Sequence, residues 1–358
     1  MNAMVLEGHG GLEKLVWHED WPVPQPGPGE VLIKVGACGL NNTDVNTRSG
    51  WYSKAVTDAT TGDAYNDVGT EDPAWGGKPI TFPRIQGADA VGTVVELGEN
   101  APADLLGKRV MVDCWLRDWT DPINREKTGY FGSEMDGGFA DYTVVDAHNV
   151  RAIESPLSDA ELATFSCSYT TAEGMLSRAG VTEGDTVLVT GASGGVGSAL
   201  VQLAKRRGAS VVALASPAKH DDVRALGADA VLERAPENLN AALNAAIGTP
   251  HVSVVADIVG GPYWGMLIDA LQRGGRYTCS GAIAGPVVEF DLRTFYLRDL
   301  TMTGSTVVAP NIFSDLVGYI ERGDVRPVLA ATYPLKDLHA AQTAFIEKKH
   351  TGNIVVIP

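Results

Sequence analysis

The strongest chemical signal in the chain is a run of glycines, Gly191-Ala-Ser-Gly194-Gly195-Val-Gly197, which follows a short apolar stretch at 186–190. Glycines in such a turn let backbone N–H groups approach a pyrophosphate, and the N-terminus of the following helix adds partial positive charge. A tight turn alone also requires glycine. The setting between a strand and a helix predicts a dinucleotide site. We expect its contacts to come from Gly191, Ser193, Gly194, Gly195, Val196 and Gly197.

The next apolar stretch, 210–214, is followed by Ala215-Ser216-Pro217-Ala218-Lys219-His220. An acidic residue at this place accepts a hydrogen bond from the ribose 2′-hydroxyl of NAD, whereas a basic residue accommodates the 2′-phosphate of NADP. No Asp or Glu stands here, while Ser216 offers a hydroxyl and Lys219 a point charge suited to phosphate. The alternative is a solvated Lys219 in the first turn of the next helix, where a cation is slightly unfavourable. We therefore predict that the cofactor is NADP(H).

The elements that must position these residues fall into two regions, which meet near residue 153. Before it, short β-rich runs separated by Gly and Pro indicate a small irregular barrel. After it, short runs typical of buried strands, at 186–190, 210–214, 252–256 and 276–279, alternate with helical segments, one of them over about 261–271. This alternation predicts an α/β fold with a doubly wound parallel sheet. The chain ends in a strand-like run at 353–357.

Composition limits the classes of protein to consider. The 28 Lys+Arg against 44 Asp+Glu give a formal net charge of −16, which argues against a nucleic-acid partner. No stretch approaches the ~18 apolar residues of a membrane span, and the N-terminus lacks the features of a signal peptide. The four cysteines (Cys38, Cys114, Cys167 and Cys279) are scattered, as is usual for a reducing compartment. We expect a soluble, cytoplasmic protein that acts on a small molecule.

The polar segment 51–82 is rich in Gly, Asp and Thr and exceeds the ~12 to 15 residues of a plain connection. It is therefore expected to be functional or mobile. Its Trp51 and Trp75, together with Trp115, either fill the core of the barrel or line an apolar substrate cleft.

Several spaced motifs resemble those of the medium-chain dehydrogenase/reductase superfamily over essentially the whole chain. They lie at 28–35, 39–44, 87–98, 107–110, 138–142, 191–197 and 352–356. The resemblance implies a GroES-like catalytic domain over 1–156 and a Rossmann domain over 157–322. A return to the catalytic domain over 323–358 is implied as well.

Zinc enzymes of this superfamily carry Cys-His where this chain has Asn41-Asn42, and Gly-His-Glu where it has Gly87-Ala88-Asp89. Cys167 and Asp89 alone remain of the usual catalytic ligands, too few for a tetrahedral Zn²⁺ site with three protein ligands. The structural zinc lobe of these enzymes needs four closely spaced cysteines. The segment 113–135 contains a single cysteine, Cys114, so we expect that lobe to be missing as well. We therefore expect no zinc; a zinc alcohol dehydrogenase would require an additional ligand.

The segment Asn41-Asn-Thr-Asp44-Val-Asn46-Thr-Arg48-Ser-Gly50-Trp-Tyr52 resembles one found in zinc-free quinone oxidoreductases and enoyl thioester reductases. That resemblance implies that Tyr52 binds the substrate and donates a proton after hydride transfer. It also implies that Asn41 positions substrate or cofactor near the nicotinamide. The alternative is that Tyr52 is an aromatic residue on the barrel surface.

The same resemblance implies further cofactor contacts at strand ends and near the nicotinamide, where tight turns would also require small residues. These candidates are Thr171, Asp257, Ser280 and Gly281. Related chains commonly form homodimers by pairing the edge strands of their Rossmann sheets, and residues 300–307 would supply such an edge here.

Together these features predict an NADPH-dependent, zinc-independent oxidoreductase that transfers hydride to a quinone, an enone or an enoyl thioester. Reduction of a conjugated C=C builds charge that a phenol or amide donor stabilises, whereas simple ketone reduction in this superfamily ordinarily relies on Zn²⁺. A zinc alcohol dehydrogenase and a non-catalytic NADPH-binding protein are the alternatives.

Overall fold

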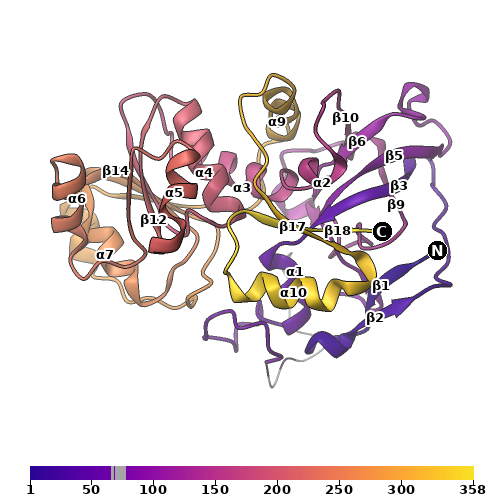
Figure 1. Ribbon diagram of the computed structural model, residues 1–358, viewed down its shortest axis with the longest axis horizontal. Coiled ribbons are helices and arrows are strands. Elements are labelled where there is room, and N and C mark those ends of the chain that lie inside the picture. Colours follow the sequence, from indigo (N-terminus) through magenta and orange to yellow (C-terminus); the bar gives the residue numbers. More distant parts are fainter. Residues whose placement is uncertain (66–67, 69–77) are drawn as a thin grey trace. The chain divides into compact units, whose positions relative to one another are not determined.

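The computed structural model describes residues 1–65, 68 and 78–358. The chain divides into two compact units. The first consists of residues 1–56, 61–167 and 309–358, and the second of residues 57–60 and 168–308. The N- and C-termini both belong to the first unit (Figure 1).

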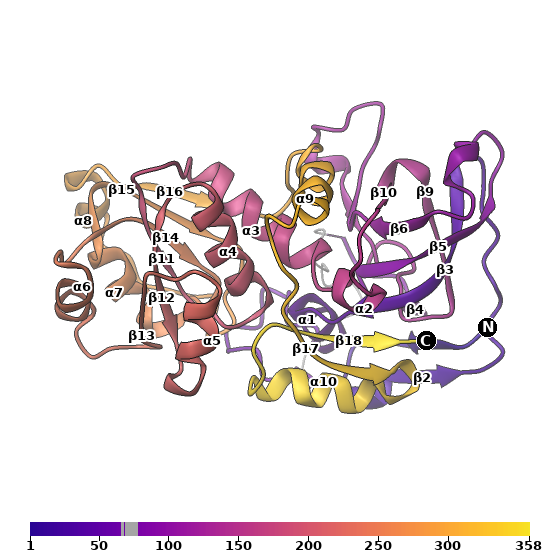
Figure 2. The ribbon, with the colours of Figure 1, turned by 45° about the horizontal axis from the view of Figure 1, so that its top comes forward.

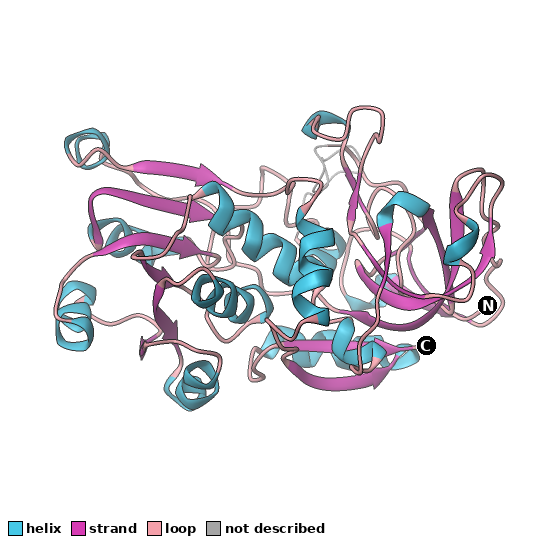
Figure 3. Cartoon of the chain, turned by 90° about the horizontal axis from the view of Figure 1, so that it is seen from above, coloured by secondary structure: helices cyan, strands magenta, loops and turns pink. Residues whose placement is uncertain are grey.

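The first unit is built around a curved seven-stranded sheet (Figure 3). Its central strand, β3, pairs antiparallel with β5, β9 and β18. The β-branched residues Val31, Ile33 and Val35 favour the extended backbone of β3 and are buried. The strands are β3 (Glu30–Gly39), β5 (Asp89–Leu97), β6 (Arg109–Val112), β9 (Tyr142–Asp146), β10 (Val150–Ala152), β17 (Leu329–Pro334) and β18 (Asn353–Ile357).

Two smaller sheets and four α-helices complete this unit within the described residues. Strands β1 (Ala3–Leu6), β2 (Leu15–His18) and β4 (Arg84–Ile85) form a three-stranded sheet, and β7 (Trp115–Leu116) pairs with β8 (Gly129–Tyr130). The helices are α1 (Asn42–Ser49), α2 (Asp159–Leu162), α9 (Ile312–Glu321) and α10 (Leu338–Glu347).

The second unit contains a six-stranded, all-parallel sheet in the order β13-β12-β11-β14-β15-β16. The strands are β11 (Thr186–Val189), β12 (Ser210–Ala215), β13 (Ala230–Glu233), β14 (Val252–Asp257), β15 (Leu271–Cys279) and β16 (Thr301–Gly304). The inner strands β11, β12 and β14 are mainly apolar and buried, as is typical of strands covered on both faces.

Helices cover both faces of this sheet (Figure 2). On one side lie α4 (Gly195–Arg206) and α5 (His220–Ala225), and on the other lie α6 (Leu239–Ile247) and α7 (Trp264–Asp269). The remaining helices that reach into this unit are α3 (Ser166–Arg178) and α8 (Leu292–Leu297). Leu188, Val255, Leu243 and Leu267 belong to one buried cluster that joins the sheet to α6 and α7.

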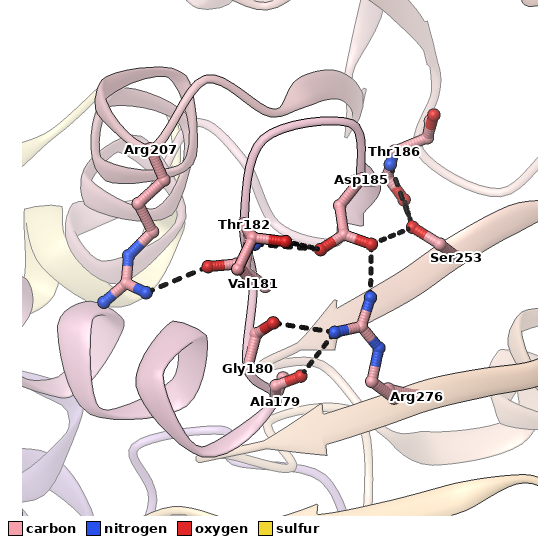
Figure 4. A network of polar contacts seen from close by, with 9 residues as sticks. All are labelled: Ala179, Gly180, Val181, Thr182, Asp185, Thr186, Arg207, Ser253 and Arg276. Atoms are coloured by element: carbon pink, nitrogen blue, oxygen red, sulfur yellow. Dashed lines mark hydrogen bonds and ion pairs between the residues drawn. The ribbon is translucent and has the colours of Figure 1, made fainter.

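A polar network fixes the amino ends of three parallel strands (Figure 4). Arg276 of β15 forms an ion pair with Asp185, which also accepts a hydrogen bond from the hydroxyl of Ser253 of β14 at 2.9 Å. The Ser253 hydroxyl oxygen accepts from the backbone N–H of Thr186 of β11 at 2.9 Å. The guanidinium of Arg276 also donates to the carbonyls of Ala179 and Gly180, which follow α3. These contacts attach the C-terminal end of helix α3 to the amino ends of the strands, opposite the end of the sheet where the glycine-rich turn lies.

The structure confirms the fold class expected from the sequence: a β-rich first unit and a parallel α/β sheet. The stretch at 300–307 contains β16, which is an edge strand of the sheet. Residues 157–167 and 309–322, expected in the Rossmann domain, group with the first unit instead. Part of the reason is α9, whose Glu321 accepts a hydrogen bond from the backbone N–H of Glu154 at 3.0 Å. Within the described residues, no helix is long and apolar enough to cross a membrane.

Candidate active site and cofactor site

Asn41 is held at the start of α1. Its backbone has extended dihedral angles, and its N–H donates to the carboxylate of Asp44 at 2.7 Å. This hydrogen bond satisfies one of the backbone N–H groups at the helix N-terminus that have no partner within the helix. Its amide nitrogen Nδ2 donates to Asp89 Oδ2 at 3.0 Å. An amide nitrogen carries two N–H groups, and the second N–H of Asn41 has no partner among the described residues.

Asp89 forms hydrogen bonds with residues at the N-termini of two helices, α1 and α3. While Oδ2 accepts from Asn41, Oδ1 accepts from the backbone N–H of Cys167 in the first turn of α3 at 2.6 Å. The side chain is fully buried, and this burial raises the pKa of Asp89 to about 7, although the two hydrogen bonds act in the opposite direction. Asp89 therefore works as a positioning residue, because both of its carboxylate oxygens are committed to neighbours.

The Cys167 thiol lies in a buried cluster with Tyr130 and Cys114. The Tyr130 hydroxyl donates to Cys167 Sγ at 3.0 Å. Burial raises the pKa of Tyr130 and of Cys114 well above their usual ranges. The Cys114 thiol therefore stays protonated, and a protonated thiol is a poor metal ligand.

Zinc does not fit this arrangement. In the parts of the chain that are described, no group of three or more His, Cys, Asp or Glu side chains is placed to hold a metal ion. Among the described residues, Asp89 and Cys167 have no third ligand beside them, and Asn41 presents an amide N–H rather than a thiolate toward Asp89.

Tyr52 follows α1 in the same unit. It is half-buried, with its ring edge-to-face against Trp51 at a centroid distance of 5.6 Å. Burial raises the pKa of the Tyr52 phenol, while hydrogen bonding with the side chains of Thr43 and Asn46 acts against that rise. The phenol is therefore protonated throughout the neutral range, as a general acid must be before it acts.

A buried guanidinium, which the sequence did not single out, fixes the segment that carries Tyr52. Arg48, in the last turn of α1, has no exposed surface. It donates to Gly10 O at 2.8 Å, to Gly62 O at 3.0 Å and to Gln342 Oε1 at 3.1 Å. These contacts join both ends of the segment between Gly50 and Gly62. No sequence pattern reveals them, because the three acceptors come from distant parts of the chain.

Two of the three tryptophans considered in the sequence are described. Trp115 is buried and packs edge-to-face on Tyr130, at a centroid distance of 5.2 Å, so it belongs to the interior of the first unit. Trp51 contacts Tyr52. Trp75 lies outside the described residues.

Three buried carboxyls have raised pKa values and give a prediction on stability. Burial raises the pKa of Asp44 and of Asp89 to about 7, and that of Asp113 to about 6, from an ordinary value of 3.8. A carboxyl whose pKa is higher in the folded than in the unfolded state favours folding while it is protonated. That contribution is present at pH values below about 4 and is lost as the pH rises through about 6 to 7.

We therefore expect the protein to melt at a higher temperature at about pH 5.5 than at about pH 8. Thermal unfolding followed by circular dichroism measures this difference. The variant Asp113→Asn should flatten the pH dependence, since its amide still accepts from the Trp115 N–H. The exposed Asp104→Asn provides the matched control. A Tm that rises steadily from about pH 5.5 to about pH 8 would contradict this prediction.

The glycine-rich turn has the geometry of a phosphate cradle. Gly191 has a left-handed backbone with φ of +56°, which favours glycine. A Cβ on Gly197 would lie 2.1 Å from Gly191 O, so only glycine lets α4 start this close to β11. At Gly194 a Cβ would meet nothing closer than 3.6 Å, so the space above this residue is open. The N-terminus of α4 begins there with backbone donors, and these residues fit a dinucleotide pyrophosphate.

The other residues proposed to contact the cofactor differ in how far their side chains are already bound within the chain. The Asp257 carboxylate accepts from the hydroxyls of Thr190 at 2.6 Å and Tyr277 at 2.7 Å, and from the N–H groups of Val259 and Gly260. It is fully buried, so its side chain shapes the turn after β14.

Ser280 and Gly281 follow β15. A Cβ on Gly281 would lie 2.9 Å from Ile258 O. The backbone of the neighbouring turn therefore favours glycine at this position even without a bound cofactor. Thr171 is buried on α3. Ser193 and Val196 are half-buried in the glycine-rich turn and the first turn of α4.

Comparison with known proteins agrees with this architecture. The model of the alcohol dehydrogenase GroES-like domain matches residues 27–155, and that of the zinc-binding dehydrogenase family matches residues 195–322. A crystal structure of a putative alcohol dehydrogenase from Sinorhizobium meliloti 1021 is 47% identical, with a TM-score of 0.90 over 100% of this chain and 96% of that one.

Two curated relatives match at lower identity. The acryloyl-coenzyme A reductase of Metallosphaera sedula is 26% identical, and the match covers 99% of each chain. The quinone oxidoreductase of Homo sapiens is also 26% identical, over 100% of this chain and 98% of that protein. The chain belongs to the medium-chain dehydrogenase/reductase superfamily, as its motifs indicated, and is an oxidoreductase of that superfamily.

Proposed function

We propose that this protein is an NADPH-dependent reductase of activated carbon–carbon double bonds or quinones that works without a metal. The observation that carries the proposal is the hydrogen bond from Asn41 Nδ2 to Asp89 Oδ2, at 3.0 Å. In zinc enzymes of the superfamily, metal ligands stand at these two positions. In this chain the two side chains at these positions bind each other instead. The protonated phenol of Tyr52 follows on the same segment and supplies an acid.

When bound, NADPH supplies a hydride to the β-carbon of the conjugated substrate. Negative charge then develops on the carbonyl oxygen, where a fixed donor lowers the barrier most effectively. Tyr52 and the second N–H of Asn41 are the donors for this role. Tyr52 then donates its proton to the α-carbon, where it stays in the new C–H bond, and a second proton, from water, restores the phenol.

Residues of the second unit hold the cofactor in this proposal. The backbone N–H groups at 195–197 face the pyrophosphate, and Ser216 with Lys219 binds the 2′-phosphate. Thr171, Ser280 and Gly281 remain candidates for contacts to the nicotinamide end.

The direct test is NADPH oxidation by chelator-treated protein with a panel of enones, enoyl thioesters, quinones and aldehydes, and NADH in parallel. We expect turnover of an alkene or a quinone with NADPH, unchanged by the chelator. Activity confined to aldehydes and abolished by chelation would contradict the proposal. Zinc added back to the chelated sample is the control, and it should not raise the rate.

Reduction of a simple aldehyde or ketone is a second candidate, favoured by the 47% identity to a putative alcohol dehydrogenase. This reaction places charge directly on an alkoxide, for which zinc is the usual Lewis acid in this superfamily. The aldehydes in the panel, assayed before and after chelation, separate the two candidates.

We further propose that two copies associate through the free edge of β16. The exposed apolar side chains of α8 and the loop before it support this interface, since a patch of this kind usually marks an association surface. They are Val287, Val288, Leu292, Tyr296 and Leu297.

The substitution Tyr296→Glu is expected to convert a dimer into a monomer, because it places a charge in the apolar patch. Light scattering after size-exclusion chromatography measures the mass. The control is Leu106→Glu, at an exposed apolar position of the first unit. A wild-type mass of one chain would overturn the dimer proposal.

We propose a cytoplasmic location for the protein. None of the four cysteines, all of which lie within the described residues, forms a disulfide, as expected where disulfides do not form. Cell fractionation with an antibody against the chain tests this location.

A further inference from the structure

Two strand ends meet at one corner of the parallel sheet. Ala215, the last residue of β12, pairs with Glu233, the last residue of β13. The residues that follow are Ser216 and Arg234, and parallel neighbours in a sheet are separated by about 4.8 Å. Both residues therefore leave the sheet side by side, at the carboxyl edge where such folds bind ligands.

Lys219 lies at the same corner. A short 3₁₀ turn over Pro217–Lys219 follows Ser216, and the N–H of Lys219 donates to Ser216 O at 2.9 Å. Burial lowers the pKa of Lys219, the positive charge of Arg234 lowers it further, and Asp222 acts in the opposite direction. The ammonium and guanidinium groups are thus close enough to destabilise each other.

Arg234 differs from most arginines of this unit. It is exposed and has no hydrogen bond or ion pair with any described residue. Arginines elsewhere in the unit form ion pairs with carboxylates: Arg207, Arg224, Arg273, Arg276, Arg293 and Arg298. In a chain with a net charge of −16, an unpaired guanidinium beside a second cation is the arrangement that a dianion would stabilise.

We infer that Arg234 is a second cationic contact for the 2′-phosphate of NADP(H), beside Lys219. This inference rests on the proposed use of NADPH. A phosphate monoester carries about −1.5 to −2 charges near neutral pH, so two cations match it better than Lys219 alone. A guanidinium also offers two parallel N–H donors to phosphate oxygens. With NADH the Arg234 guanidinium would remain unpaired beside the Lys219 ammonium, so Arg234 acts against NADH as well as for NADPH.

The test measures dissociation constants of NADPH and NADH for the full chain by fluorescence titration. Arg234→Gln should weaken NADPH binding about tenfold or more, leave NADH binding unchanged or tighter, and raise KM for NADPH while kcat stays the same. Arg234→Lys should restore part of the loss. The control Arg206→Gln removes the same charge at the far end of α4 and should change neither constant.

An unchanged ratio of the two dissociation constants in Arg234→Gln would overturn this inference while the NADPH proposal stands. A wild-type protein that binds NADH as tightly as NADPH would overturn the NADPH proposal and this inference with it. Binding of adenosine 2′,5′-bisphosphate provides an independent readout, since it carries the 2′-phosphate without the nicotinamide. Its affinity should fall in Arg234→Gln by the same factor as that of NADPH.

Discussion

Substituting phenylalanine for Tyr52 is expected to lower kcat for a conjugated enone by about 100-fold or more, the typical contribution of a positioned general acid. The ring and its contact with Trp51 remain in Tyr52→Phe, so the loss isolates the hydroxyl. KM should change much less than kcat, because the proton is transferred only after the substrate has bound. Stopped-flow measurement of NADPH oxidation separates the chemical step from product release.

The matched control for this experiment is Tyr142→Phe, which removes a hydroxyl from a half-buried tyrosine on β9. It should keep the wild-type rate. A wild-type rate in Tyr52→Phe would show that the proton comes from another group or from water. Because burial raises the pKa of Tyr52, the wild-type rate should also show no titration of this acid between about pH 6 and about pH 9.

Replacing Arg48 by methionine is expected to have the largest effect on stability. The change leaves Gly10 O, Gly62 O and Gln342 Oε1 without their donors, and all three residues are buried. Each unsatisfied buried acceptor costs about 1–3 kcal/mol, so the free energy of unfolding should fall by about 3 kcal/mol or more. Urea denaturation followed by circular dichroism measures the loss.

Arg48→Lys should show an intermediate loss, because an ammonium cannot reach three acceptors as a planar guanidinium does. The exposed Arg322→Met is the control and should be close to neutral, because its ion pair with Asp324 lies at the surface. Equal midpoints for Arg48→Met and wild type would contradict the assigned role. The loss should extend to kcat, since Arg48 anchors the segment that carries Tyr52.

The parallel sheet was predictable because its signals are local. Three of its inner strands, β11, β12 and β14, are short and mainly apolar runs, and the glycine-rich turn marks the start of α4 directly. The start of α1 also has a local signal in Asn41 and Asp44, three residues apart, a spacing typical of helix N-termini.

Contacts over long sequence distances could not be predicted. The Asp89 partner in α3 is the backbone N–H of Cys167, and a backbone donor has no residue-type signature. The contacts of Arg48 depend on carbonyls brought together only by the complete fold of the first unit. Arg234 has no motif around it, and its proximity to Lys219 becomes visible only from the register of β12 and β13.

The measurement that tests the central claim most directly follows deuterium from NADPH, labelled at C4 of the nicotinamide, into the product of an enone. Chelator-treated protein is used, and the product is analysed by NMR. We predict a saturated ketone with deuterium on the β-carbon and a solvent-derived hydrogen on the α-carbon. Deuterium on the carbinol carbon of an allylic alcohol, or transfer that stops on chelation, would contradict a metal-free reductase of activated double bonds.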